Sequence, residues 1–128
     1  MAAGKYNFTI EQGTTVNLEL AYKDVSGSAI DLTGYSGRMQ IRPDFADNTK
    51  TSYIYLSSSL NADGTGLNFS GSSGLNPPAS GTIGIYISAA SSSALNFDSA
   101  LYDIEIQSGS VVTRLLQGTI KLSREVTR

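Results

Sequence analysis

The sequence contains no cysteine, no histidine and no tryptophan. These absences exclude a Ser-His-Asp or Cys-His nucleophile, a zinc site built from imidazole or thiolate ligands, haem ligation by those side chains, and a disulfide framework. Charge is also scarce: 16% of the residues are charged, and 9 Lys and Arg are outnumbered by 11 Asp and Glu, for a net charge of -2. Because no basic run is present to neutralise phosphates, we expect no nucleic-acid partner.

Long hydrophobic runs are missing as well. Residues 1–6 lack the ~7–15-residue apolar core of a secretory signal, and no stretch approaches the ~20 apolar residues of a membrane span. We therefore expect a soluble protein that is not exported by that route and has no membrane partner. The length of 128 residues fits a single domain, residues 1–128.

Ser, Thr, Gly and Asn are abundant, and apolar and polar residues alternate in short segments between turns. The clearest alternation covers residues 16–22, where Val16, Leu18, Leu20 and Tyr22 share one face of a strand. Similar segments predict strands at 6–10, 36–42, 51–56, 67–69, 81–88, 102–106 and 111–122. The sequence therefore predicts an all-β fold, an antiparallel β-sandwich of immunoglobulin-like or jelly-roll-like type with about seven to nine short strands.

Several local features refine this expectation. Residues 11–14 predict a tight hairpin or a corner at which the chain changes sheet, and residues 89–95 predict one short helical turn. Gly118, inside the last strand, predicts a bulge or bend. Outside the strands we expect an N-terminal arm at 1–5, a long loop at 57–80 and a C-terminal tail at 124–128.

Two groups of residues were candidates for a cation or catalytic site. Asp44, Asp47 and Asn48 share one loop, and residues 61–64 resemble a fragment of a calcium loop, but no bidentate acid follows at the required distance. These segments are typical of turns. The acids Glu19, Asp103 and Glu105 alternate with apolar strand residues and so point outward rather than across a cleft. We expect no catalytic residues, no metal and no cofactor. We therefore expect that the protein is not an enzyme.

Aromatic residues leave a second function class open. A platform of rings for sugar stacking would make the chain a carbohydrate-binding module that recognises host or matrix glycan, whereas aromatics in strands more often fill a core or flank a subunit contact. The candidate rings are Tyr35, Tyr53, Tyr55, Tyr86 and Phe97.

Three segments together are distinctive: AIDLTGYSGRMQIR at 29–42, YDIEI at 102–106, and VTRLLQGTIKLSREVTR at 112–128. They resemble small virion structural proteins of tailed bacteriophages, a family that is similar to the amino-terminal β-sandwich domain of phage upper-baseplate proteins. The opening segment YNFTIEQG at 6–13 also fits, while the 57–80 loop is not covered by the motif.

The resemblance implies assembly rather than catalysis. Such a protein would be an adaptor or decoration protein of the tail, baseplate or neck, made in the host cytoplasm and located in the virion. Its partners would be copies of itself, in a homo-oligomer, and other virion proteins. A sandwich with exposed edge strands is compatible with this role, because an edge can accept a strand from a neighbour.

The C-terminal tail is the segment for which we expect contacts between chains. Residues 124–128 continue the alternation of the last strand but carry only one large apolar residue, so they gain little by burial in their own core. We expect Val126 to fill a shallow pocket on another subunit, with Arg124 and Arg128 reaching acidic partners. The alternative is a frayed terminus.

Overall fold

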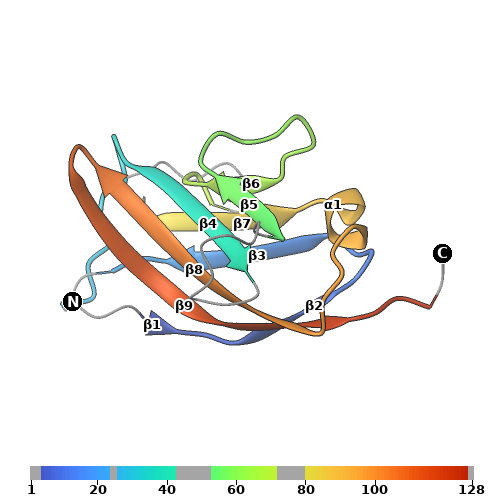
Figure 1. Cartoon of the computed structure of the whole chain (residues 1–128). Coiled ribbons are helices and arrows are strands. Elements are labelled where there is room, and N and C mark those ends of the chain that lie inside the picture. The colour runs from blue at the N-terminus through green and yellow to red at the C-terminus, as the bar shows by residue number, and fades with distance from the viewer. Residues whose placement is uncertain (1–3, 24–25, 43–52, 72–79, 127–128) are drawn as a thin grey trace.

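A computed structural model describes residues 4–23, 26–42, 53–71 and 80–126. In these residues the chain forms strands packed as two sheets, with one short helix (Figure 1). The elements are β1 (Gly4–Lys5), β2 (Phe8–Glu11), β3 (Val16–Ala21), β4 (Ser36–Arg42), β5 (Ile54–Ser57), β6 (Gly66–Asn68), β7 (Thr82–Ile87), α1 (Ala89–Ser93), β8 (Ser99–Ser108) and β9 (Val111–Ser123). The predicted all-β sandwich is confirmed.

The larger sheet has the order β1-β9-β8-β4-β5, with β2 also paired to β9, and the smaller sheet has the order β3-β7-β6. Most neighbouring strands are antiparallel, as expected, but β1 and β2 both run parallel to β9. Lys5, expected in an N-terminal arm, pairs in β1 with Gln117. The first and last strands of the chain therefore lie side by side.

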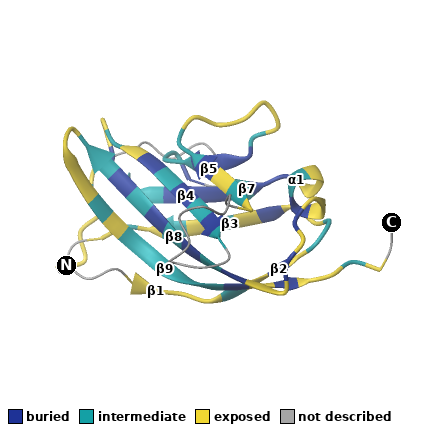
Figure 2. Cartoon of the chain, in the orientation of Figure 1, coloured by how far each residue is buried: buried dark blue, intermediate teal, exposed yellow. Residues whose placement is uncertain are grey.

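The alternation of apolar and polar residues along the strands determines which residues form the hydrophobic core. Along β4 and β8, buried and partly exposed residues alternate, as the colour bands of Figure 2 show. Met39, Ile41, Ile104 and Ile106 of these strands are at most 1% exposed. They face inward against the smaller sheet, whose Ile83 and other odd-numbered residues of β7 are also buried. The hydrophobic core thus lies between the two sheets.

Residues 11–14 form the predicted corner between sheets. β2 belongs to the larger sheet and β3 to the smaller one. Thr14 N–H donates to the Glu11 carbonyl at 3.1 Å, and Gly13 has a φ of 84°, a conformation that favours glycine. The corner is anchored by Ser92 of α1, whose Oγ donates to the Thr14 carbonyl at 2.6 Å.

The expectation for 89–95 is confirmed, since α1 begins after Ser88, whose hydroxyl accepts from the Ser91 N–H at 3.1 Å. The long loop expected at 57–80 contains β6, which pairs with β7. A bulge is present in β9, but its position was predicted wrongly. The register of β8 with β9 shifts between Ile104 and Glu105, which makes Leu115 the extra residue, while Gly118 pairs regularly with Tyr102.

Gly118 is needed for a different reason. A Cβ at this position would lie 2.1 Å from the Tyr6 carbonyl oxygen, so the N-terminal segment passes directly against the backbone of β9. Tyr6 N–H donates to the Gln117 carbonyl at 3.0 Å, and Thr119 N–H donates to Asn7 Oδ1 at 2.9 Å. Asn7 thus replaces a backbone acceptor where the pairing of β1 and β2 with β9 is interrupted.

Candidate functional site

One side of the sandwich carries an apolar groove. It lies between the β1–β2 edge of the larger sheet and β3, which ends the smaller sheet. Its volume is about 330 Å³. The lining residues are Tyr6, Phe8, Leu18, Glu19, Leu20, Ile85, Tyr102 and Leu116. On the opposite side of the sandwich β5 and β6 contact each other, so the two sides differ.

Aromatic rings form one wall of the groove. Tyr6 stacks on Phe8 with ring centroids 5.7 Å apart, and Phe8 meets Tyr102 edge-on at 5.3 Å. Tyr6 is 51% exposed, and Phe8 is only partly buried. Apolar ring surface of this kind is a common feature of protein contacts, because it provides large area at little cost in side-chain entropy.

The outer edge of β3 is the other wall, and no strand pairs with it among the described residues. Tyr22 N–H donates to the Gly81 carbonyl at 2.8 Å, one step beyond the pairing of Ala21 with Thr82. Since peptide groups alternate in direction along a strand, those of Val16, Leu18 and Leu20 point to β7. The peptide groups of Asn17 and Ala21 therefore point outward, where an added strand would bond.

The outer face of the larger sheet carries most of the charged pairs. Arg38 Nε lies 3.0 Å from Glu105 Oε1, and Arg114 Nε lies 3.5 Å from Asp103 Oδ2. Burial, and then the nearby Glu105, raise the pKa of Asp103 above its ordinary value. Asp103 and Glu105 do point outward from β8, as expected, but they are paired with arginines on a flat sheet rather than facing each other across a cleft.

The structure places the predicted tail residues at the end of β9. Arg124 donates to Asn96 Oδ1 at 2.8 Å and lies 3.3 Å from Asp98 Oδ1, so the acid it reaches belongs to its own chain. Glu125 N–H donates to Gln12 Oε1 at 3.0 Å. Val126 is 95% exposed, and Arg128 lies outside the described residues. The tail is thus attached as far as Glu125, and Val126 makes no core contact.

The five candidate rings are divided among different environments. Phe97 is buried and stacks on Tyr53 at 4.7 Å, and Tyr35 packs against the core. Tyr55 is exposed on β5 of the larger sheet, while Tyr86 lies on β7 of the smaller sheet. These rings do not form one platform.

The candidate cation segments behave as turns where they are described. Gly64 N–H donates to the Asn61 carbonyl at 2.9 Å, and Asp63 accepts from Thr65 N–H and Ser88 Oγ. These hydrogen bonds lower the pKa of Asp63, that from Ser88 most. Asp44, Asp47 and Asn48 lie outside the described residues. In the described part of the chain, no three Asp, Glu, His or Cys side chains gather as a metal site would require.

Sequence reasoning identified Leu18 and Leu20 as inward-facing but missed the groove beside them. Alternation shows which face of a strand is apolar, whereas the groove depends on which strand ends the smaller sheet. The sequence does contain one indication of a site on the outer face of the smaller sheet. Gly84 interrupts an isoleucine-rich strand, and glycine inside a strand often marks a close approach or a hollow.

A comparison with protein-family models and with curated proteins found no match to this chain. Within the described ranges, no helix has the length and hydropathy needed to cross a membrane.

Proposed function

We propose that this chain is a non-enzymatic structural protein of a tailed-phage virion, an adaptor or decoration protein of the tail, baseplate or neck that works by joining protein chains. The resemblance of residues 29–42 and 112–128 supports the virion role. The observation that carries the assembly role is the outer edge of β3, which borders an apolar groove.

The partner that this edge fits is a second copy of the chain. A two-fold antiparallel pairing of β3 with β3, centred on Leu18, sets Val16 opposite Leu20 of the other copy. The same register sets Asn17 opposite Glu19, an amide facing a carboxylate rather than two like charges. The edge is therefore self-complementary, and its pairing would join the two smaller sheets into one while covering both grooves.

The test compares the association of two variants at one exposed position. Ala21→Pro removes an outward N–H donor and leaves the β3–β7 hydrogen bonds intact, because proline is tolerated on edge strands. Ala21→Thr keeps the N–H and serves as the matched control. Sedimentation velocity over a concentration series should show a dimer or larger oligomer for the wild type and Ala21→Thr, and a folded monomer for Ala21→Pro.

A wild type that stays monomeric at every concentration would contradict pairing between copies, as would an Ala21→Pro variant that associates like the wild type. The virion role is tested separately by a cryo-electron microscopy map of a particle that contains this chain. We expect repeated copies in the tail, baseplate or neck, related by rotational symmetry. A single copy per particle would argue against the proposal.

A further inference from the structure

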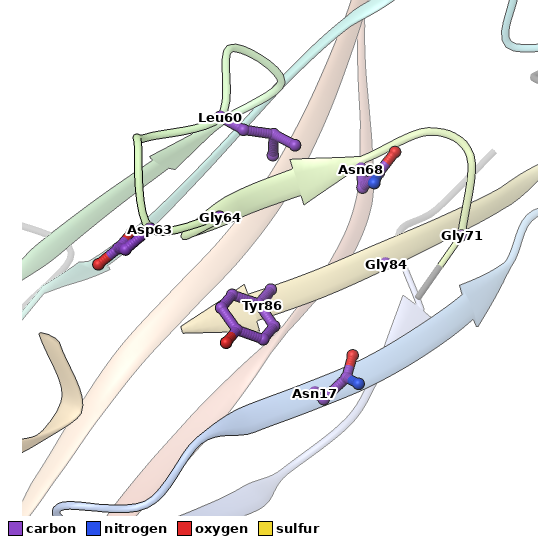
Figure 3. A pocket seen from close by; sticks show the side chains of 8 residues that line it. All are labelled: Asn17, Leu60, Asp63, Gly64, Asn68, Gly71, Gly84 and Tyr86. Carbon is purple, nitrogen blue, oxygen red and sulfur yellow. The ribbon is translucent and has the colours of Figure 1, made fainter. Parts of the chain in front are cut away.

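The outer face of the smaller sheet has a hollow that is separate from the groove. Its floor is Gly84 of β7, which lies between Glu19 of β3 and Asn68 of β6 in the sheet register. Because Gly84 has no side chain, the neighbouring side chains surround an indentation of about 190 Å³ (Figure 3). The lining residues are Asn17, Leu60, Asp63, Gly64, Asn68, Gly71, Gly84 and Tyr86.

Tyr86 supplies an aromatic surface beside this floor. It stands on β7 two residues from Gly84, and its ring lies against Gly64, where a Cβ would be 3.4 Å from the ring. Figure 3 shows the ring between the Asp63–Gly64 turn and the Asn17 side chain. A ring of this type offers an apolar face and a hydroxyl that both donates and accepts hydrogen bonds.

Uncommitted polar groups surround the ring. Within the described residues, neither the Asn17 amide nor the Tyr86 hydroxyl has a hydrogen-bond partner. Asn68 Oδ1 accepts from Ser70 N–H at 2.9 Å, which leaves its NH₂ group as a donor. Asp63 accepts hydrogen bonds from Thr65 and Ser88, and its carboxylate keeps further acceptor capacity.

This combination selects one chemical class of ligand. The Asp63 carboxylate in the lining, with Glu19 beside the floor, disfavours phosphate and other anions. Among the described residues no third acid joins them as a cation site would require. Donors and acceptors beside an apolar ring match a polyhydroxylated ring, which has C–H faces and a hydroxyl rim. The volume is below the ~300–1,000 Å³ of sites for drug-sized ligands, so it suits one sugar ring.

We propose that this hollow binds a single neutral pyranose residue, a terminal sugar of a glycan, by contact of the sugar with the Tyr86 ring, hydrogen bonds with the Asn17 and Asn68 amides, and a sugar hydroxyl that donates to Asp63. This binding site lies on the outer face of the smaller sheet, whereas assembly through the groove uses the edge of β3. Asn17 of β3 borders both.

The test is a titration of the ¹⁵N-labelled protein with methyl glycosides of glucose, galactose, mannose and N-acetylglucosamine, followed by NMR. At millimolar sugar we expect shifts of the Asn17 and Asn68 side-chain NH₂ signals and of the Gly84 amide for at least one glycoside. Tyr86→Ala and Asn17→Ala should each weaken that affinity by about tenfold or more. Tyr86→Phe, which keeps the ring and the fold, should weaken it less than Tyr86→Ala.

Tyr55→Ala is the matched control, because it removes an exposed strand tyrosine from the other sheet. It should leave the glycoside affinity unchanged. Absence of shifts with all four glycosides would overturn the proposal, as would undiminished binding by Tyr86→Phe and Asn17→Ala together. Equal loss in Tyr55→Ala would also overturn it, because the bound sugar would then lie elsewhere.

Discussion

The Tyr102 hydroxyl donates a 2.6 Å hydrogen bond to the backbone carbonyl of Tyr6, and Gly118, which pairs with Tyr102 in the sheet, leaves the space that this carbonyl occupies. The bond joins the N-terminal segment to the centre of the larger sheet. It also fixes Tyr6 and Phe8, the aromatic wall of the groove.

Gly118→Ala should therefore destabilise the domain. The new Cβ would meet the Tyr6 carbonyl at 2.1 Å, and a backbone atom cannot move aside as a side chain can. We expect a loss of about 1–3 kcal/mol in the free energy of unfolding, typical of overpacking. Denaturant unfolding measures it. Gly4→Ala is the control at a glycine that also lies against β9 without a positive φ, where the nearest atom is the end of the Leu116 side chain, and a Gly118→Ala loss no larger than that of Gly4→Ala would contradict the close approach.

Tyr102 should give the unfolding free energy a dependence on alkaline pH. Burial, with repulsion from Tyr6, raises the pKa of Tyr102 to about 12. The native state thus keeps this proton after the unfolded chain, with a pKa of ~10, has lost it. The contribution to stability is fully present below pH ~10 and is lost as the pH rises towards ~12.

Ultraviolet titration of phenolate should find a late-ionising tyrosine in the wild type that is lost in Tyr102→Phe. Tyr55→Phe, at an exposed position, should retain the late ionisation. Tyr102→Phe should also cost about 0.5–1.5 kcal/mol at neutral pH through the lost hydrogen bond. Ionisation of all tyrosines near pH ~10 in the folded protein would disprove the assignment.

Asp103→Asn should leave the melting temperature at neutral pH unchanged or raised. The raised pKa of Asp103 means that the folded state disfavours its charge, because of burial and the neighbouring Glu105. The negative charge of Asp103 therefore destabilises the folded state at neutral pH, and this penalty disappears as the pH falls through the pKa of Asp103 in the folded state. The gain in melting temperature of Asp103→Asn should be smallest in acid. Glu105→Gln, which weakens the bond to Arg38, should lower the melting temperature instead. Calorimetry at two pH values distinguishes these results.

Ser92→Ala should loosen the corner between the sheets. Ser92 is fully buried, and its hydroxyl donates to the Thr14 carbonyl. Its removal leaves that carbonyl without this donor, at a cost of about 1–3 kcal/mol. Ser93→Ala, on the exposed side of α1, is the control. If the two variants unfold at the same denaturant concentration, the corner does not depend on this bond.

Deletion of residues 124–128 should leave the melting temperature of the isolated domain within a few degrees. Arg124 and Asp98 form an exposed ion pair, worth ~0–1 kcal/mol, and Val126 makes no core contact. We expect the deletion to weaken incorporation into the particle, because Val126 would contact another subunit. A competition assembly of intact and truncated chains measures this, and equal incorporation would refute it.

The fold was largely predictable because each strand carries its own alternation. β4 begins and ends as expected at Ser36 and Arg42, since Pro43 follows and turn residues precede it. The parallel pairing of Phe8 with Ile120 was not predictable. Alternation specifies which face of a strand is buried, and it contains no information on which distant strand supplies the hydrogen bonds.

The candidate sites were less predictable for the same reason. The hollow at Gly84 needs Asn17, Asn68 and Tyr86 from three strands, and their proximity follows only from the β3-β7-β6 register. Tyr86 was selected from the sequence as a ring, but grouped with Tyr55, which lies on the other sheet. The type of each residue indicated which side chains could take part in a site, whereas their separation in the sequence did not indicate which of them lie together.

The parallel pairing of β2 with β9 also determines when the larger sheet can be completed during synthesis. Asn7 and Thr119, which bond across this pair, are 112 residues apart in sequence. During synthesis β2 therefore leaves the ribosome well before its partner β9 does. Phe8 and Ile10 must remain without their sheet neighbours until then. A chain released before β9 is complete would therefore expose this apolar segment as an aggregation-prone end.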